Sequence, residues 1–169
     1  TSSRLSALSQ NAAFTLLAAL GLKLGGYRIV QFVCQAGMSP CVLGTNRQDY
    51  RQPPPCKACI DQTKCLTQAF ETYWFAPRTE EQLAEMLAKL SVEELGEFEF
   101  ATPLFDEPIP LGRFVLPSIR WALRCHHLPE DEPTRYLLRQ YILSAYNVAV
   151  HFDQLLNQEK PTACLIFNG

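Results

Sequence analysis

The chain has 169 residues, 47% of them hydrophobic, and a formal net charge of -2 at pH 7. A chain of this length buries roughly 70% of the surface of its unfolded state, so it can form a core without disulfide bonds. The near-neutral charge, without a cluster of Lys or Arg, argues against a nucleic-acid partner. No apolar stretch reaches the ~20 residues of a membrane-spanning helix, so we expect no transmembrane segment.

The longest apolar stretch, residues 11–24, is interrupted by Thr15 and Lys23. It lacks the preceding basic region and the following cleavage site of a secretory signal, and it therefore predicts a buried helix. We expect a cytoplasmic protein. Its seven cysteines would then stay reduced, as core residues, metal ligands or redox groups.

The first predicted element is a helix over residues 5–24, capped by Ser6 or Ser9 and ended by Gly25-Gly26. Residues 27–34 are rich in β-branched and aromatic side chains and predict a strand. A helix, a glycine turn and a strand make half of a βαβ unit, which indicates a parallel sheet. The strand that should precede this helix is missing, so we expect the chain to be part of a larger protein.

Glycines and prolines predict a loop over residues 35–55, and a helix is expected over residues 56–74. Thr79 with Gln82, and Ser91 with Glu94, form capping-box patterns that predict two helix starts. The later predictions are a short strand over residues 97–100, a helix from Pro117 to His126, a long helix from Asp131 and Pro133 to about residue 157, and a buried parallel strand over residues 163–167.

The order of these elements predicts an α/β, helix-rich, Rossmann-like fold with a small parallel sheet. A cysteine-bearing loop insertion spans residues 34–65. We expect a single domain over residues 1–169, which would be the N-terminal half of a two-domain protein.

Two parts of the chain resemble GT-B glycosyltransferases. Residues 11–20, Gly25-Gly26 and residues 27–30 are similar to the first helix and second strand of that class. Pro117-Ser118, Leu123-Arg124 and the long helix leading to residues 166–169 are similar to bacterial surface- or capsule-polysaccharide biosynthesis proteins of the class. In those proteins a strand that ends in Asn-Gly leads into the interdomain cleft, and the pattern of Cys34, Cys41 and Cys56-x-x-Cys59 also resembles one in this group.

This resemblance covers about half of the chain and implies the acceptor-side half of a glycosyltransferase. The missing C-terminal domain would bind the sugar nucleotide, and the complete protein would transfer the sugar to a carbohydrate acceptor. We expect no activity from this half alone.

Five of the seven cysteines lie between residues 34 and 65. A Cys-x-x-Cys pair can bind one ion at about 2.3 Å, and a second, looser pair can complete a tetrahedron. The spacing predicts a structural zinc ion on Cys34, Cys41, Cys56 and Cys59, with an iron–sulfur cluster as the alternative metal group. Because a closed site of four thiolates is structural, the chain could also be a non-catalytic, metal-stabilised interaction module.

Two further interpretations of the cysteines stay open. Cys56 and Cys59 could be a redox pair at a helix N-terminus, which would make the chain a thiol-redox protein. All the thiols could also be unligated or form disulfides after purification. Cys65, Cys125 and Cys164 are expected to be core residues, because cysteine is among the most buried residue types.

Candidate ligand-binding residues lie at the ends of predicted elements. Ligands of open α/β sheets bind beyond the carboxyl ends of the strands, so Asn168 and Gly169, after the last predicted strand, are candidates. Asn11 is a third candidate, because the N-terminus of a helix can bind a phosphate or an acceptor group. A plain turn and a polar helix start are the alternative interpretations.

The remaining polar residues carry weaker hypotheses. We expect His126, His127 and His151 to be structural. Asp106 and Glu107 could act as a general base in a loop, although acidic loop residues are common. The sequence identifies no catalytic residue.

Overall fold

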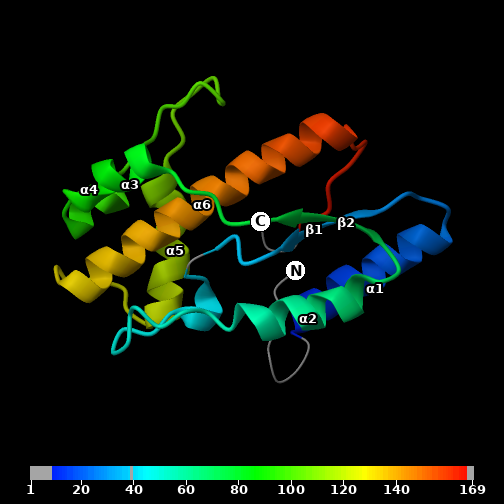
Figure 1. Ribbon diagram of the computed structural model, residues 1–169, viewed down its shortest axis with the longest axis horizontal. Coiled ribbons are helices and arrows are strands. Elements are labelled where there is room, and N and C mark those ends of the chain that lie inside the picture. The colour runs from blue at the N-terminus through cyan, green and yellow to red at the C-terminus, as the bar shows by residue number, and fades with distance from the viewer. Residues whose placement is uncertain (1–8, 39, 167–169) are drawn as a thin grey trace. The chain divides into compact units, whose positions relative to one another are not determined.

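We describe a computed structural model of the chain, in which residues 9–38 and 40–166 are described. The described residues form an α/β, helix-rich fold with a small parallel sheet of two strands, as the sequence predicts (Figure 1). Within these residues, no helix combines the length and the apolarity needed to cross a membrane. The elements in chain order are α1 (Gln10–Leu24), β1 (Val30–Cys34), η1 (Val42–Gly44), α2 (Cys56–Thr67), β2 (Glu71–Phe75), α3 (Glu81–Ala88), α4 (Val92–Gly96), α5 (Leu111–Leu123) and α6 (Glu132–Glu159).

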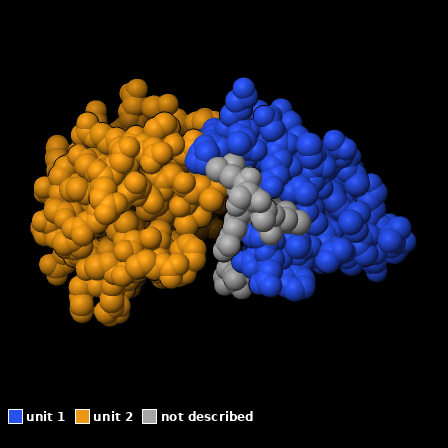
Figure 2. All heavy atoms as spheres, turned by 90° about the horizontal axis from the view of Figure 1, so that it is seen from below, with its two compact units in different colours: residues 1–36, 55–76, 151–169 blue, residues 37–54, 77–150 orange. Residues whose placement is uncertain are grey.

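The chain divides into two compact units, coloured separately in Figure 2. Unit 1 comprises residues 1–36, 55–76 and 151–169, and unit 2 comprises residues 37–54 and 77–150. Neither unit is a continuous stretch of sequence, and α6 contributes residues to both. The expectation of a single domain over residues 1–169 stays a prediction.

Unit 1 is built on the parallel pairing of β1 with β2, in which Phe32 lies opposite Tyr73 and Cys34 opposite Phe75. Side chains alternate between the two faces of a strand. The rings of Phe32 and Phe75 stack on one face at 4.7 Å, and Phe152 of α6 meets Phe32 edge-on at 5.4 Å. Figure 1 shows α1 and α2 on the other side of the strands. The two strands are thus covered by helices on both faces, which is usual for parallel sheets.

Two cations join the helix ends of unit 1 at the edge where the strands begin. Lys23, in the last turn of α1, donates to the carbonyl of Ala69, between α2 and β2. Arg28 bridges Glu71 at 2.5 Å and Glu159, the last residue of α6, at 2.6 Å. The hydrogen bond from Arg28 lowers the pKa of Glu71. The ends of α1, α2 and α6 therefore lie at the amino edge of the sheet, and these helices run antiparallel to the strands.

Unit 2 has an apolar core in which α3, α4 and α5 pack with the first part of α6. Its fully buried side chains include Leu83, Leu87, Leu95, Leu111, Ile119, Leu137, Leu138 and Ile142. At Gly112 of α5 an added Cβ would collide with the carbonyl oxygen of Leu95. Only glycine allows α5 to approach α4 this closely.

Several predicted boundaries are confirmed. Ser9 caps α1 by accepting a hydrogen bond from the amide of Ala12, and Gly25 ends that helix. The capping box of Ser91 and Glu94 is complete at the start of α4. The Asp131 carboxylate accepts a hydrogen bond from the amide of Thr134 at the beginning of α6, as predicted.

Other predicted elements are wrong. The helix over residues 56–74 stops at Thr67, because Glu71–Phe75 is rich in the aromatic and β-branched residues of a strand. Pro117 lies inside α5 instead of starting it. Leu111, Val115 and Ile119 bury one face of α5, and this burial outweighs the hydrogen bond that the proline removes.

Three predictions concern shorter segments. The strand over residues 97–100 is reduced to one antiparallel bridge between Phe100 and Ile109. Residues 163–166 are exposed and form no strand, and Phe167 lies outside the described residues. The pattern at Thr79 makes no capping box, because α3 starts at Glu81 and its N-cap is Glu80.

Replacing Ser91 by alanine should lower the free energy of unfolding by about 1 kcal/mol, because the amide of Glu94 loses its capping acceptor. The matched variant Thr79→Ala removes a hydroxyl with the same sequence context but without a cap, and we expect no change. Chemical denaturation followed by circular dichroism measures both. Hydrogen bonds from Ser91 lower the pKa of Glu94. The capping box therefore stabilises the protein above the ordinary carboxyl pKa, and this stabilisation is lost as the pH falls through the lowered pKa of Glu94. Equal losses in the two variants would contradict this assignment.

Candidate functional site

The carboxyl edge of the two strands brings four backbone ends together in unit 1. β1 ends at Cys34 and β2 at Phe75, and the antiparallel helices α1 and α2 begin at this edge. The N-terminus of a helix carries partial positive charge, and neither α1 nor α2 has an acidic residue in its first turn. Since ligands of parallel α/β sheets bind at the carboxyl ends of the strands, this carboxyl edge is the candidate functional site.

A strained turn follows β1 at the carboxyl edge. The amide of Gln35 donates to the carbonyl of Phe75 at 2.8 Å and extends the ladder by one residue. Ala36 then adopts a left-handed conformation with φ of 58°. This conformation costs an alanine roughly 1–2 kcal/mol, and such strain concentrates at binding sites and ligand clamps.

One of the three predicted ligand residues lies at the carboxyl edge. Asn11 is exposed in the first turn of α1, and its backbone carbonyl accepts a hydrogen bond from the hydroxyl of Thr15 at 2.8 Å. Its side chain is accessible to solvent at the start of the helix. Asn168 and Gly169 lie outside the described residues.

The four predicted zinc ligands are distributed over both units. Cys56 and Cys59 lie at the start of α2, and Cys34 ends β1. Because Cys34 is paired with Phe75, it faces the side of the strands that α6 covers, whereas Figure 1 shows α2 on the other side. Cys41 belongs to unit 2, directly before η1. Within residues 9–38 and 40–166 no three His, Cys, Asp or Glu side chains are arranged to hold a metal ion. Zinc and the iron–sulfur cluster both stay predictions.

The remaining cysteines differ from expectation. Cys65 and Cys164 are exposed, so their predicted place in the core is wrong. Cys65 falls on the outer face of α2, and Cys164 follows α6 in a segment without a strand. Cys125 is half-buried beyond the end of α5, where its thiol donates to the carbonyl of His127 at 2.7 Å.

His151, which the sequence predicts to be structural, contacts a residue of β2 that the sequence did not indicate. The hydroxyl of Tyr73 donates to Gln154 at 3.2 Å and lies 3.3 Å from Nδ1 of His151. His151 thus joins α6 to β2.

A polar clamp in unit 2, not predicted from the sequence, holds the segment after the strained turn. Asn147 of α6 is buried and donates from its amide to the carbonyl of Gly37 at 2.7 Å. Ser144, also buried, donates to the carbonyl of Pro40 at 3.4 Å. Polar residues three positions apart within an apolar helix face are the signal that could have revealed this clamp.

Tyr141 completes the polar clamp one turn earlier on α6. Its hydroxyl lies 2.7 Å from that of Thr45, which itself donates to the carbonyl of Cys41 at 2.9 Å. The phenol of Tyr141 is therefore the donor of the shared hydrogen bond. Burial raises the pKa of Tyr141 above its ordinary value, and the nearby Cys41 adds to this effect. The donor thus stays protonated at neutral pH.

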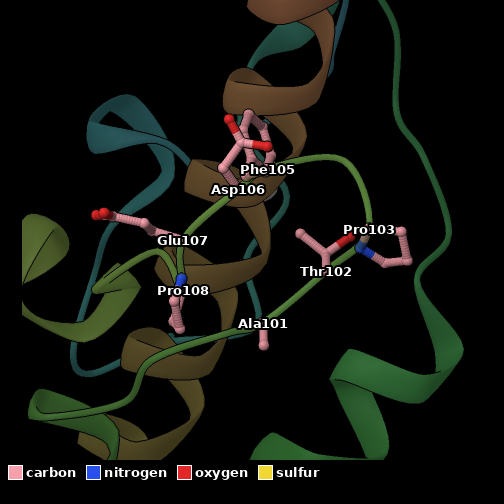
Figure 3. Close-up of a pocket in the computed structure, with 7 residues that line it drawn as sticks. All are labelled: Ala101, Thr102, Pro103, Phe105, Asp106, Glu107 and Pro108. Atoms are coloured by element: carbon pink, nitrogen blue, oxygen red, sulfur yellow. The ribbon is translucent and has the colours of Figure 1, made fainter.

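The predicted acidic pair lies in a loop of unit 2. Residues 101–103 and 105–108, which include Asp106 and Glu107, line an open hollow of about 330 Å³. Figure 3 shows that their carboxylates point apart. The pair does not converge on one point where a substrate proton could lie.

A scan against models of protein families, a search of curated proteins and a search of solved structures each found no match. A function for the carboxyl edge can therefore be proposed only from its geometry and from the resemblance to GT-B glycosyltransferases described above.

Replacing Asn147 by alanine should lower the free energy of unfolding by about 1–3 kcal/mol, because the buried carbonyl of Gly37 loses a short hydrogen bond. The longer contact of Ser144 predicts a smaller loss for Ser144→Ala. Thermal and urea unfolding would give this order, with exposed Asn157→Ala as the control. A larger loss for Ser144→Ala than for Asn147→Ala would contradict the clamp geometry.

Proposed function

We propose that this chain is the acceptor-side, Rossmann-like domain of a GT-B type glycosyltransferase of surface-polysaccharide biosynthesis. The observation that carries the proposal is the parallel β1–α2–β2 arrangement preceded by α1, because it brings two strand ends and two helix starts to one edge. The residues that resemble glycosyltransferases, 11–20 and 25–30, make up α1, its glycine end and the approach to β1. The first of the two resembling parts thus involves the same elements as the candidate site.

The carboxyl edge offers groups that can bind the hydroxyls of a sugar. Sugar hydroxyls are recognised by a small number of well-placed backbone and amide groups. Asn11 supplies an exposed side-chain amide, and the turn at Ala36 supplies backbone groups. In the proposed enzyme this edge holds the carbohydrate acceptor, and a second domain of the same protein binds the sugar nucleotide. No residue is assigned to catalysis.

The proposal predicts that the protein binds a saccharide at the carboxyl edge. Isothermal titration calorimetry with a panel of di- and trisaccharides containing hexoses, N-acetylhexosamines and uronic acids would identify a ligand. Replacing Asn11 by alanine should then weaken binding about tenfold, because one hydrogen bond of about 1.4 kcal/mol is lost.

Asn157 provides the matched control, since it is also an exposed asparagine of unit 1 but lies near the end of α6, at the amino edge. Asn157→Ala should bind with unchanged affinity. The proposal fails if no saccharide of the panel binds, or if the two variants lose affinity equally.

A further inference from the structure

The outer face of α1 is apolar. The buried side of this helix carries Ala12, Leu16 and Ala19. On the opposite side, residues alternately three and four positions apart make a row that we call the α1 stripe, namely Phe14, Leu17, Gly21 and Leu24. Its three large side chains are 57%, 64% and 90% exposed, in chain order. A surface helix of a folded domain normally presents polar residues on this side, so the α1 stripe indicates a surface that a partner covers.

The α1 stripe carries no charge. Lys23 is the only charged residue of α1, and its ammonium group donates to the carbonyl of Ala69. Arg28, just after the helix, is bound to Glu71 and Glu159. A helix that binds a lipid surface carries Lys and Arg residues beside its apolar face, and the α1 stripe has none beside it. Two copies of an uncharged face, by contrast, can meet without repulsion.

The α1 stripe is also complementary to itself in shape. Its spacing is that of the apolar seam between two interlocking helices. When two copies of α1 lie antiparallel, related by a twofold axis at the level of Ala19, Leu17 of each copy faces Gly21 of the other. Phe14 of each copy then lies against Leu24 of the other. At Gly21 an added Cβ would meet no atom within 4 Å outside the backbone of its own helix, so this position is open to a leucine side chain.

The size of this face fits a reversible dimer. With 15 residues, α1 is about 22 Å long and roughly 10 Å wide. Leu20 and Leu22, which are 41% and 42% exposed, lie beside the stripe and enlarge the apolar surface. Each partner of a standard stable complex buries about 800 Å², and the face of a single short helix is smaller. The dimer should therefore form and dissociate with protein concentration.

We propose that the α1 stripe is the interface of a symmetric homodimer, in which α1 packs antiparallel against α1 of a second copy. A twofold interface requires that residue i contacts residue j while j contacts i. The stripe meets this requirement with a leucine facing a glycine on each side of one centre. A partner of different sequence would need no such symmetry, and the observations therefore favour a second copy.

Sedimentation equilibrium under reducing conditions, over a wide range of protein concentrations, tests the proposal. We expect a monomer–dimer equilibrium for the wild type. Leu17→Glu should raise the dissociation constant at least about a hundredfold, because a carboxylate would be buried without a partner. The matched control is Leu104→Glu, which changes an exposed leucine of unit 2 and should leave the dissociation constant unchanged. Circular dichroism verifies that each variant is folded.

A charge pair tests the antiparallel register. Gly21→Lys alone should also weaken the dimer, because its ammonium group would face the apolar side chain of Leu17. In a mixture of Leu17→Glu with Gly21→Lys, the introduced carboxylate and ammonium group face each other, while the second layer keeps its original leucine and glycine. The mixture should therefore form a heterodimer, although each variant alone is a monomer.

Three results would overturn the proposal. The first is a wild type that remains a monomer at every concentration, and the second is an equal loss of dimer in Leu17→Glu and Leu104→Glu. The third is a mixture of the two charged variants that stays monomeric. Co-sedimentation of the monomeric wild type, but not of Leu17→Glu, with phosphatidylcholine vesicles would overturn it as well, and would assign the α1 stripe to a lipid surface.

Discussion

The parallel pairing of β1 with β2 is the constraint on which unit 1 depends. Two parallel strands cannot be joined by a short turn, because the chain must return to the amino edge before the second strand begins. Helix α2 makes this return, and Lys23 and Arg28 attach α1, β2 and α6 to the same end. The helix starts and the strand ends are therefore brought to the opposite edge, where ligands of parallel α/β sheets bind.

The sequence predicted the elements whose signals are local. The serine of the capping box at Ser91 and the acidic start of α6 at Asp131 act within one helical turn, and the structure shows both. The end of α2 and the interior position of Pro117 were wrong because tertiary packing decides them. β2 forms as a strand only because β1 is available to pair with it, and α5 continues through Pro117 because its apolar face is buried.

The candidate site could be predicted only in part, for the same reason. Asn11 is a candidate because a helix start can be recognised from the sequence alone, and the pair of Cys56 and Cys59 is one because of its spacing. The left-handed Ala36 carries no signal, since alanine rarely adopts this conformation. The clamp formed by Asn147 and Ser144 was missed because its acceptors are backbone carbonyls more than a hundred residues away, and any residue type can supply a carbonyl.

The 28 residues of α6 belong to two cores, with the part up to Val150 in unit 2 and the part from His151 in unit 1. Starting a helix is the costly step in helix formation, whereas extending an existing helix adds one hydrogen bond for each residue that is ordered. Once unit 2 has ordered its part of α6, the segment from His151 to Glu159 therefore grows from a helix that already exists. The segment that carries Phe152, whose ring meets Phe32 edge-on, would then form by extension of a helix that unit 2 has already begun.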